Sequence, residues 1–306
     1  MNIVNKKYWF FLLSAIIIIP GIISLAVSGL KPGTDFQSGT TMTVNFQPSV
    51  EEGTLRQELT TLKYSDAVVQ KEASGDYIIT LAGQITTDER AQLEKDLGTS
   101  LNTTVTISSY ESVTPSVASQ TVRNATIAVA VAAVGILLYI TFAFRKMPRP
   151  LRWGTCAVIA LIHDVLVVLG IFSILGWAAG VKVDALFITG MLTVAGYSVH
   201  DTIVVFDRIR ENMSKRVGGE FAEVVNYSIV QTLVRSLNTS LTVIFVLLAL
   251  LLLGGSTIHY FVLVLLIGVT TGTYSSIFNA SSLLIVWENR EWNQWFHSSR
   301  KAKVTG

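Results

Sequence analysis

Two acidic residues lie inside long apolar stretches of the sequence, where a charged side chain is costly. Asp164 lies near the middle of the apolar run 153–175, and Asp201 lies inside the run 183–206. An ionisable side chain near the centre of a bilayer costs about 2.5–3.5 kcal/mol, and such residues usually face a bundle interior and mark ion or proton pathways. Both carboxylates are therefore candidates for binding a proton within a membrane.

The sequence also supplies partners for this chemistry. Arg235 and Asn238 stand at the start of the next apolar run, 237–254, among hydroxyl-bearing residues. A carboxylate with a guanidinium and a line of hydroxyls nearby can bind and release a proton as helices shift. The competing interpretation is a static polar network that only holds helices together. For Asp201 we favour the proton-binding role, whereas for Asp164 both interpretations stay open.

Other reactive residue types give no sign of an enzyme. His163 and His200 precede the two carboxylates and are expected to be hydrogen-bonding neighbours rather than metal ligands. Cys156 is the only cysteine, which excludes an internal disulfide and a cysteine-based zinc site. An HExxH motif is absent, and the two aspartates lack the sequence context of an intramembrane aspartyl protease. We expect no metal or other cofactor, only protons as the coupling ion.

Small residues in the apolar runs predict close helix packing. The candidates are Gly190, Gly196, Gly268 and Gly272, and the last two have the GxxxG spacing that lets helix backbones approach in a membrane. The spacing is common in membrane helices, so it indicates tight packing within the bundle or against another subunit without choosing between them.

Composition and the lengths of the apolar runs predict a membrane protein. Half of the 306 residues are hydrophobic and only 14% are charged, with a mean hydropathy of +0.52. A helix that crosses a bilayer needs roughly 20 apolar residues. Six runs meet this length: 8–30, 121–144, 153–175, 183–206, 237–254 and 259–287. The first could instead be a cleaved signal peptide, but its apolar stretch is longer than usual for one.

The distribution of lysine and arginine predicts the orientation of these spans. Basic residues gather in the loops 145–152 and 207–235 and in the tail 288–306, whereas the short loops after the third and fifth spans hold almost none. By the positive-inside rule both termini are cytoplasmic and the polar segment 31–120 is outside. The domain boundaries follow: 1–30, then 31–120, then spans two to six over 121–287, then the tail. A net charge of +2 gives no case for nucleic acid.

The polar segment 31–120 has the periodicity of a small α+β domain. Alternating and helical patterns predict strand, helix, strand, strand, helix and strand at 40–46, 50–62, 67–71, 77–81, 86–97 and 103–109, with Thr87 as the N-cap of the second helix. This βαββαβ order is the ferredoxin-like arrangement. The segment contains no His or Cys and no suggestive pair of carboxylates, so we expect an interaction module.

A long motif in the fourth span resembles a known family. Residues 196–212, GYSVHDTIVVFDRIREN, are similar to the signature of the SecD/SecF protein-export family. Supporting similarities are PGTDF at 32–36, His-Asp at 163–164, RSLNTS at 235–240 and GTYSSI at 272–277. Two positions depart from the family pattern: His200 stands where Asn is usual, so it could join a proton pathway or alter its pH response, and Ser38-Gly39 replaces a Gly-Gly pair.

The resemblance implies a fold, a function and partners. The fold is half of an RND-type transporter bundle, completed by the relative SecD beside the SecYEG channel, with YajC as a further partner, in a bacterial plasma membrane. The function is to draw secreted polypeptide outward at a late stage of export using the proton motive force, and Asp201 and Arg235 match the positions tied to proton conduction. The alternative function is an RND-like exporter of a small molecule or lipid.

Overall fold

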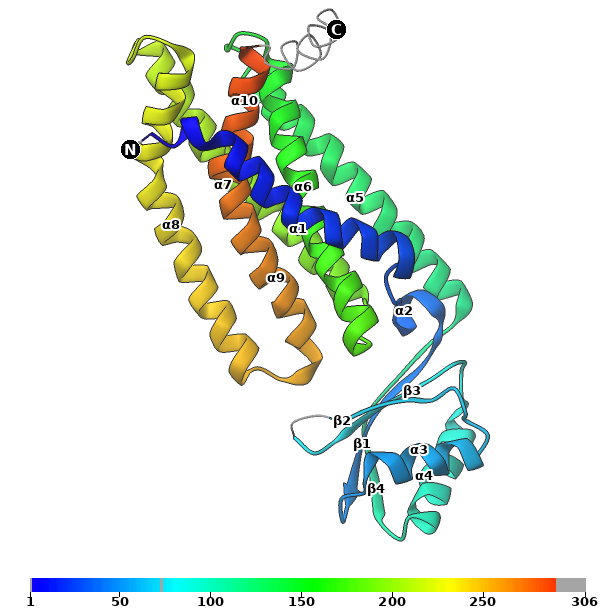
Figure 1. Ribbon diagram of the computed structural model, residues 1–306. Helices are drawn as coiled ribbons and strands as arrows, with labels where there is room; N and C mark the ends of the chain where they lie inside the picture. Colours follow the sequence, from blue (N-terminus) through cyan, green and yellow to red (C-terminus); the bar gives the residue numbers. More distant parts are fainter. Residues whose placement is uncertain (1, 72–73, 290–306) are drawn as a thin grey trace, which may run out of the picture. The chain divides into compact units, whose positions relative to one another are not determined.

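The structure is a computed structural model that describes residues 2–71 and 74–289 (Figure 1). Nearly all of the expected cytoplasmic tail, 288–306, lies outside the described residues. Contacts divide the chain into two units: Met1–Lys31, Ala128–Val181 and Leu186–Gly306 form one, and Pro32–Ile127 with Lys182–Ala185 form the other. We call them the membrane unit and the external unit, and describe each by itself.

Six helices among the described residues are long and apolar enough to cross a membrane, which confirms the predicted number. They are η1 Val4–Lys6 continued by α1 Lys7–Ser28; α5 Pro115–Ala143; α6 Pro150–Ala179; α7 Ala185–Ser214; α8 Phe221–Leu253; and α9 Ser256–Tyr274 with the π-helical turn η2 Ser275–Ala280 and α10 Ser281–Glu288. The last span is therefore one rod with a π-helical segment inside it.

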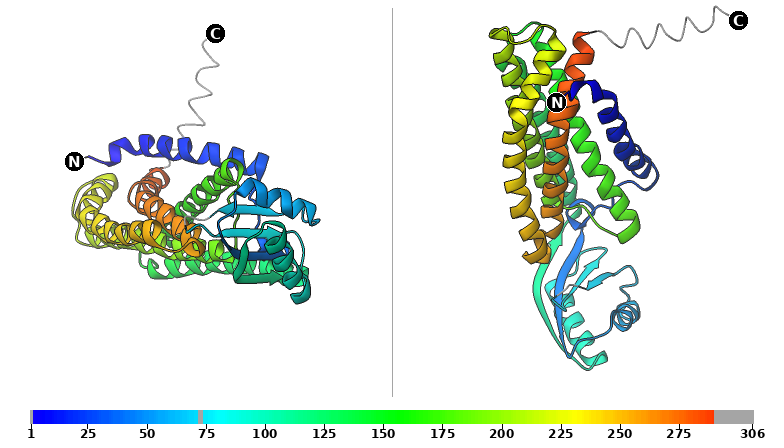
Figure 2. Two further views of the ribbon diagram at one scale, coloured as in Figure 1. Left: turned by 90° about the horizontal axis from the view of Figure 1, so that it is seen from below. Right: turned by 60° about the vertical axis from the view of Figure 1, so that its left-hand side comes forward.

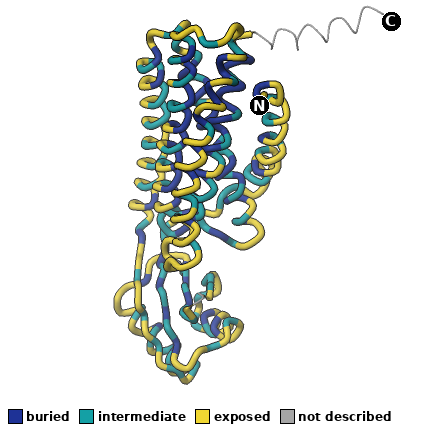
Figure 3. Tube along the Cα trace, turned by 90° about the vertical axis from the view of Figure 1, so that its left-hand side faces the viewer, coloured by how far each residue is buried: buried dark blue, intermediate teal, exposed yellow. Residues whose placement is uncertain are grey.

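Burial separates central from peripheral helices in the membrane unit. The spans formed by α6, by α7 and by α9 to α10 are the most buried, whereas α1, α5 and α8 are largely exposed. Figure 3 shows exposed positions on the outside of the bundle and buried ones within it. Figure 2 shows α1 lying along one side of the other helices, and α1 packs against α6.

The stretch 207–235, expected as a cytoplasmic loop, is helical except for residues 215–220. Charged side chains one turn apart support the end of α7: Glu211 accepts hydrogen bonds from both Arg208 and Lys215. Pairs at this spacing stabilise exposed helix. Hydropathy marks only the apolar part of a helix, so the sequence pattern missed these polar extensions.

The external unit confirms the predicted βαββαβ order. Its elements are α2 Thr34–Gln37, β1 Gly39–Gln47, α3 Glu52–Thr61, β2 Val68–Lys71, β3 Tyr77–Leu81, α4 Thr87–Ser100 and β4 Thr104–Val113. The strands form one antiparallel sheet in the order β2-β3-β1-β4. Met42, Val44 and Phe46 alternate along β1 and share a core with leucines of α3 and α4, which cover one face of the sheet.

One helix cap differs from the sequence prediction. The N-cap of α4 is Thr86, not Thr87: the Thr86 hydroxyl accepts from the Glu89 backbone N–H, and the Glu89 carboxylate accepts from the Thr86 N–H. This reciprocal pair is a capping box, which satisfies two backbone donors. The prediction weighed only the residue three positions after Thr87, which is Arg90, and so missed the Glu89 that completes the box.

Candidate functional site

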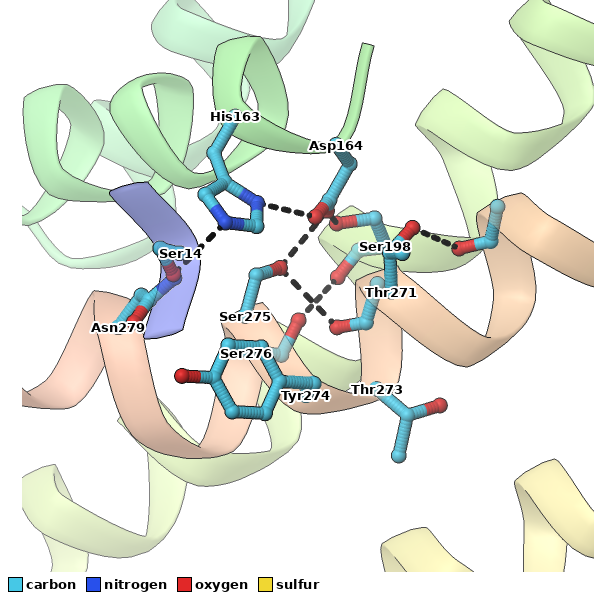
Figure 4. Close-up of polar contacts among 12 residues, drawn as sticks. Ser14, His163, Asp164, Ser198, Thr271, Thr273, Tyr274, Ser275, Ser276 and Asn279 are labelled. Atoms are coloured by element: carbon cyan, nitrogen blue, oxygen red, sulfur yellow. Dashed lines mark hydrogen bonds and ion pairs between the residues drawn. The ribbon is translucent and has the colours of Figure 1, made fainter. Parts of the chain in front are cut away.

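Asp164 lies at the centre of a buried polar network in the membrane unit (Figure 4). Its side chain is fully buried in α6. Oδ2 accepts hydrogen bonds from Ser198 of α7 at 2.5 Å and from Ser275 of η2 at 2.7 Å. Oδ1 lies 3.0 Å from Nδ1 of His163. The carboxylate therefore has partners from two neighbouring elements as well as its own helix, as a buried polar group requires.

A second ring of contacts extends this network to the first span. Nε2 of His163 lies 2.9 Å from the hydroxyl of Ser14 in α1, which also accepts from Nδ2 of Asn279 at 2.7 Å. Four helical segments, α1, α6, α7 and the η2 turn, thus meet in one set of hydrogen bonds. This arrangement supports the static interpretation that stayed open for Asp164, and it also provides a continuous line of exchangeable protons.

The π-helical turn explains how the last span supplies so many of these groups. Ser275, Ser276 and Asn279 are all buried in η2. Ser275 donates to Asp164, while Ser276 donates to the backbone carbonyl of Ser198 at 2.9 Å. The wider π turn alters the α-helical spacing, and such turns occur often at functional sites.

Asp201 is held much more weakly than Asp164, although it is only 2% exposed. The Ser240 hydroxyl of α8 lies 3.5 Å from its Oδ2, and the Thr273 hydroxyl is a second hydrogen-bonding neighbour. The Ser240 hydroxyl also lies 2.9 Å from the Ser236 carbonyl and 2.6 Å from the Thr273 hydroxyl, so its single proton has several acceptors. Within the part of the chain that the structure describes, no basic side chain forms an ion pair with Asp201.

The structure does not bring Arg235 or Asn238 to Asp201, whereas the neighbouring His200 is near enough to act on its charge. Arg235 and Asn238 lie on the exposed face of α8, and His200 lies on the exposed face of α7. Ser236, one residue after Arg235, is buried. Successive helical residues point about 100° apart, so the sequence placed Arg235 on the right helix but could not give its direction.

The predicted glycines differ in what surrounds them. An added Cβ would lie 2.9 Å from Val264 at Gly190, 2.2 Å from Val194 at Gly268 and 3.1 Å from Ser198 at Gly272. These three glycines therefore permit close packing of α7 and α9. Gly196 faces open space.

A close backbone approach between α1 and α6 was not predicted. A Cβ on Gly21 of α1 would lie 2.8 Å from the Cα of Gly170 in α6. Sequence reasoning also missed Ser14, Ser275 and Asn279. Ser14 stands out only weakly in the sequence, because the same apolar run also holds Ser24 and Ser28.

Comparison with known proteins identifies the family to which the sequence belongs. The profile described as "Protein export membrane protein SecD/SecF, C-terminal" matches residues 93–290. The profile "SecD/SecF GG Motif" matches residues 23–50. The chain belongs to the SecD/SecF family. The matched residues include the spans that carry Asp164 and Asp201 and the two ends of the external unit.

Relatives within the SecD/SecF family are similar over the full length. The chain is 49% identical over 304 residues to a protein translocase subunit SecF from Thermobaculum terrenum, covering 95% of each. It is 42% identical over 307 residues to another from Anaerolinea thermophila, covering 98% of each.

Longer relatives match over only part of their length. A crystal structure of SecDF from Thermus thermophilus, described as translocon-associated, matches with a TM-score of 0.83 at 34% identity over 94% of this chain but 39% of its own. A SecDF from Bacillus subtilis is 33% identical over 94% of this chain and 38% of its own. The structural match agrees with the predicted RND-type helical fold.

Proposed function

We propose that this chain is the SecF-type subunit of the bacterial Sec protein-export machinery. It pairs with SecD in the plasma membrane, with both termini cytoplasmic, and uses the proton motive force to promote late movement of secreted polypeptides. SecYEG and YajC are its further partners in this proposal. The relatives named as translocase subunits support the export role, and the basic loops support the orientation.

The weak hydrogen bonding of the Asp201 carboxylate is the observation that supports proton coupling in this proposal. A carboxylate in an apolar span costs about 2.5–3.5 kcal/mol unless it is paired, and the hydrogen bond that Ser240 donates to Asp201 is long, at 3.5 Å. Asp164, in contrast, receives three close contacts. A weakly held carboxylate can take up a proton at low cost and lose it when a basic group approaches. Asp201 is therefore the proton-binding group, and Asp164 anchors the helices around it.

The exposed polar residues of α7 and α8 support pairing with SecD. Arg235, Asn238 and His200 are exposed on spans that are otherwise apolar, and an arginine facing lipid is unfavourable. A second helical bundle packed against α7 and α8 would cover these side chains and bring its own polar groups to them. SecDF relatives, in which a longer chain contains a region similar to this one, support SecD as that bundle.

The available energy suits repeated small movements. One elementary charge crossing a potential of 100 mV releases about 2.3 kcal/mol. This amount biases a two-state movement of helices by roughly fiftyfold but is too small to unfold a domain, which is typically stable by 5–15 kcal/mol. Proton binding at Asp201 therefore drives shifts of helix position, and export advances over many such cycles.

The test is Asp201→Asn in cells that carry SecD and SecYEG. The asparagine keeps the size and hydrogen-bonding capacity of the side chain but cannot exchange a proton. Export that depends on the proton motive force should fall to the level seen when the potential is dissipated, while the variant still assembles with SecD. If export in Asp201→Asn still depends on the proton motive force as in the parent protein, the proposal is wrong.

Matched variants make this test specific. Asp207→Asn removes the same charge from the same helix, at a site where the carboxylate pairs with Arg210 and is exposed; export should be retained. His200→Asn restores the residue usual in the family and should also keep export. Loss of export in the Asp207 variant would mean that any change of charge on α7 disables the protein.

A further inference from the structure

The segment that follows α1 is tied to the short connection between α6 and α7. Pro32 forms a parallel β-bridge with Val183, and the Gly33 N–H donates to the Val183 carbonyl at 2.7 Å. A Cβ on Gly33 would lie 3.0 Å from that carbonyl oxygen, so the close approach of the two backbones favours a glycine. All three residues belong to the external unit.

Asp35 extends this tie to the first residue of α7. Its Oδ2 accepts a hydrogen bond of 2.7 Å from the backbone N–H of Ala185, where α7 begins. The first N–H groups of a helix have no acceptor within the helix, and a negative charge at this end is stabilising. Asp35 therefore caps α7 from a position 150 residues away in sequence.

The other side of Asp35 is fixed to the sheet of the external unit. Asp35 lies in α2, which passes into β1 through Ser38 and Gly39, both with positive φ. A Cβ on Gly39 would lie 2.6 Å from the Leu81 carbonyl, so this turn is packed directly against β3. β1 then pairs with β3 and with β4. A short and well-packed path thus joins the cap to the middle of the sheet.

The capped helix is also the helix that carries the proton-binding group. α7 runs without interruption from Ala185 to Ser214, and Ala185 is assigned to the external unit while the residues after it belong to the membrane unit. A regular α-helix transmits axial displacement because every turn is hydrogen-bonded to the next. A shift at Asp201 therefore reaches Ala185.

We propose that Asp35 is a positioning residue that couples α7 to the external sheet, so that movement of α7 on proton binding at Asp201 is transmitted to the external unit. This inference rests on the proposed function and names the residue through which the movement of α7 reaches the external sheet. The Pro32–Val183 bridge keeps the two backbones in register, and the Asp35 carboxylate makes the connection to the helix itself.

The experiment compares Asp35→Ala and Asp35→Asn with Asp66→Ala in the full chain, co-expressed with SecD. Asp66 is an exposed carboxylate of the same unit, without a partner in the part of the chain that the structure describes. Hydrogen exchange at residues 185–188 should become about 5- to 30-fold faster in Asp35→Ala and stay unchanged in Asp66→Ala. The stimulation of export by the proton motive force should be lost in Asp35→Ala and partly kept in Asp35→Asn, whose amide oxygen still accepts from Ala185.

Two outcomes would overturn the proposal. The first is faster exchange at the start of α7 with stimulation fully kept, which would mean that the cap carries no coupling. The second is unchanged exchange, which would mean that the cap does not hold α7. If Asp35→Ala does not accumulate in the membrane, Asp35→Asn decides through export: partial loss of the stimulation supports the proposal, and stimulation fully kept overturns it.

Asp201→Asn in the same assay separates this inference from the proposed function. Stimulation lost in Asp201→Asn but kept in Asp35→Ala removes the coupling role of Asp35 and leaves the proposed function standing. Stimulation kept in Asp201→Asn removes the proposed function itself.

Discussion

The hydroxyl of Ser275, the first residue of the π-helical turn, lies 2.7 Å from Oδ2 of Asp164 on α6. The same oxygen accepts from Ser198 of α7. One carboxylate oxygen therefore connects three central spans. This relationship makes Asp164 a structural centre of the membrane unit and leads to the first prediction.

Asp164→Asn should keep the thermal stability of the protein within about 1 kcal/mol, whereas Asp164→Leu should lose about 1–3 kcal/mol. An amide oxygen can accept from both serines while its NH₂ faces His163, so all partners stay satisfied. Leucine leaves the Ser198 and Ser275 hydroxyls buried without an acceptor. The midpoint of thermal unfolding in detergent measures both. Equal loss in the two variants would show that the charge itself holds the network.

Gly170→Ala should destabilise the membrane unit by about 1–3 kcal/mol, the usual cost of overpacking. The added Cβ would lie 2.6 Å from the Cα of Gly21, and backbone atoms cannot move aside as a flexible side chain can. Gly196→Ala is the control, because no atom lies within 4 Å of its Cβ position. Unfolding midpoints of the two variants give the comparison; equal values would mean that α1 is not packed closely on α6.

Acid should weaken the start of α4 through Glu89. Hydrogen bonds from the backbone and side chain of Thr86 lower the pKa of Glu89 below its ordinary value of 4.5. A lowered pKa in the folded state means that this contribution to stability is present above the unfolded pKa and is lost as pH falls through the folded pKa. Hydrogen exchange of α4 in the full chain should rise on acidification below about pH 4.5, and Glu89→Gln should remove that part of the dependence. The same pH dependence in Glu89→Gln would assign it to another group.

Asn226→Ala should release the N-terminal segment. Oδ1 of Asn226 accepts from the backbone N–H groups of Ile3 at 2.7 Å and Val4 at 3.3 Å, and both of these residues are buried. Removing the acceptor leaves two buried donors, at about 1–3 kcal/mol each when unsatisfied. Cleavage near residue 5 by added protease should become faster, whereas Asn5→Ala, an exposed site, should behave like the parent protein. Equal protection in both variants would mean that hydrophobic burial alone holds the segment.

The sequence predicted those features that depend on local pattern. The six spans follow from the length of apolar runs, and β1 follows from the alternation of Met42, Val44 and Phe46. The burial of Asp164 and Asp201 was expected because a lone carboxylate in an apolar run has no other favourable place. These predictions need only the solvent preference of each side chain.

The remaining features depend on contacts between distant segments. The contact of Ser14 with His163 joins residues 149 apart, and the cap of Ala185 by Asp35 joins residues 150 apart, so no local pattern predicts either. The direction of Arg235 depends on the rotation of α8, which its neighbours set. The π turn at Ser275 depends on how the last span packs, since its residues also suit an α-helix.

The π turn has a mechanical consequence for the last span. A π-helical turn holds one residue more than an α-helical one, and a single residue corresponds to about 100° of rotation in an α-helix. Converting η2 to α geometry would therefore rotate α10 by about that angle relative to α9, so that Ser275 and Asn279 could not both keep their partners. The π-helical segment thus sets the rotation of α10 relative to α9, and a one-residue deletion within Ser275–Ala280 would hold the last span in α-helical geometry.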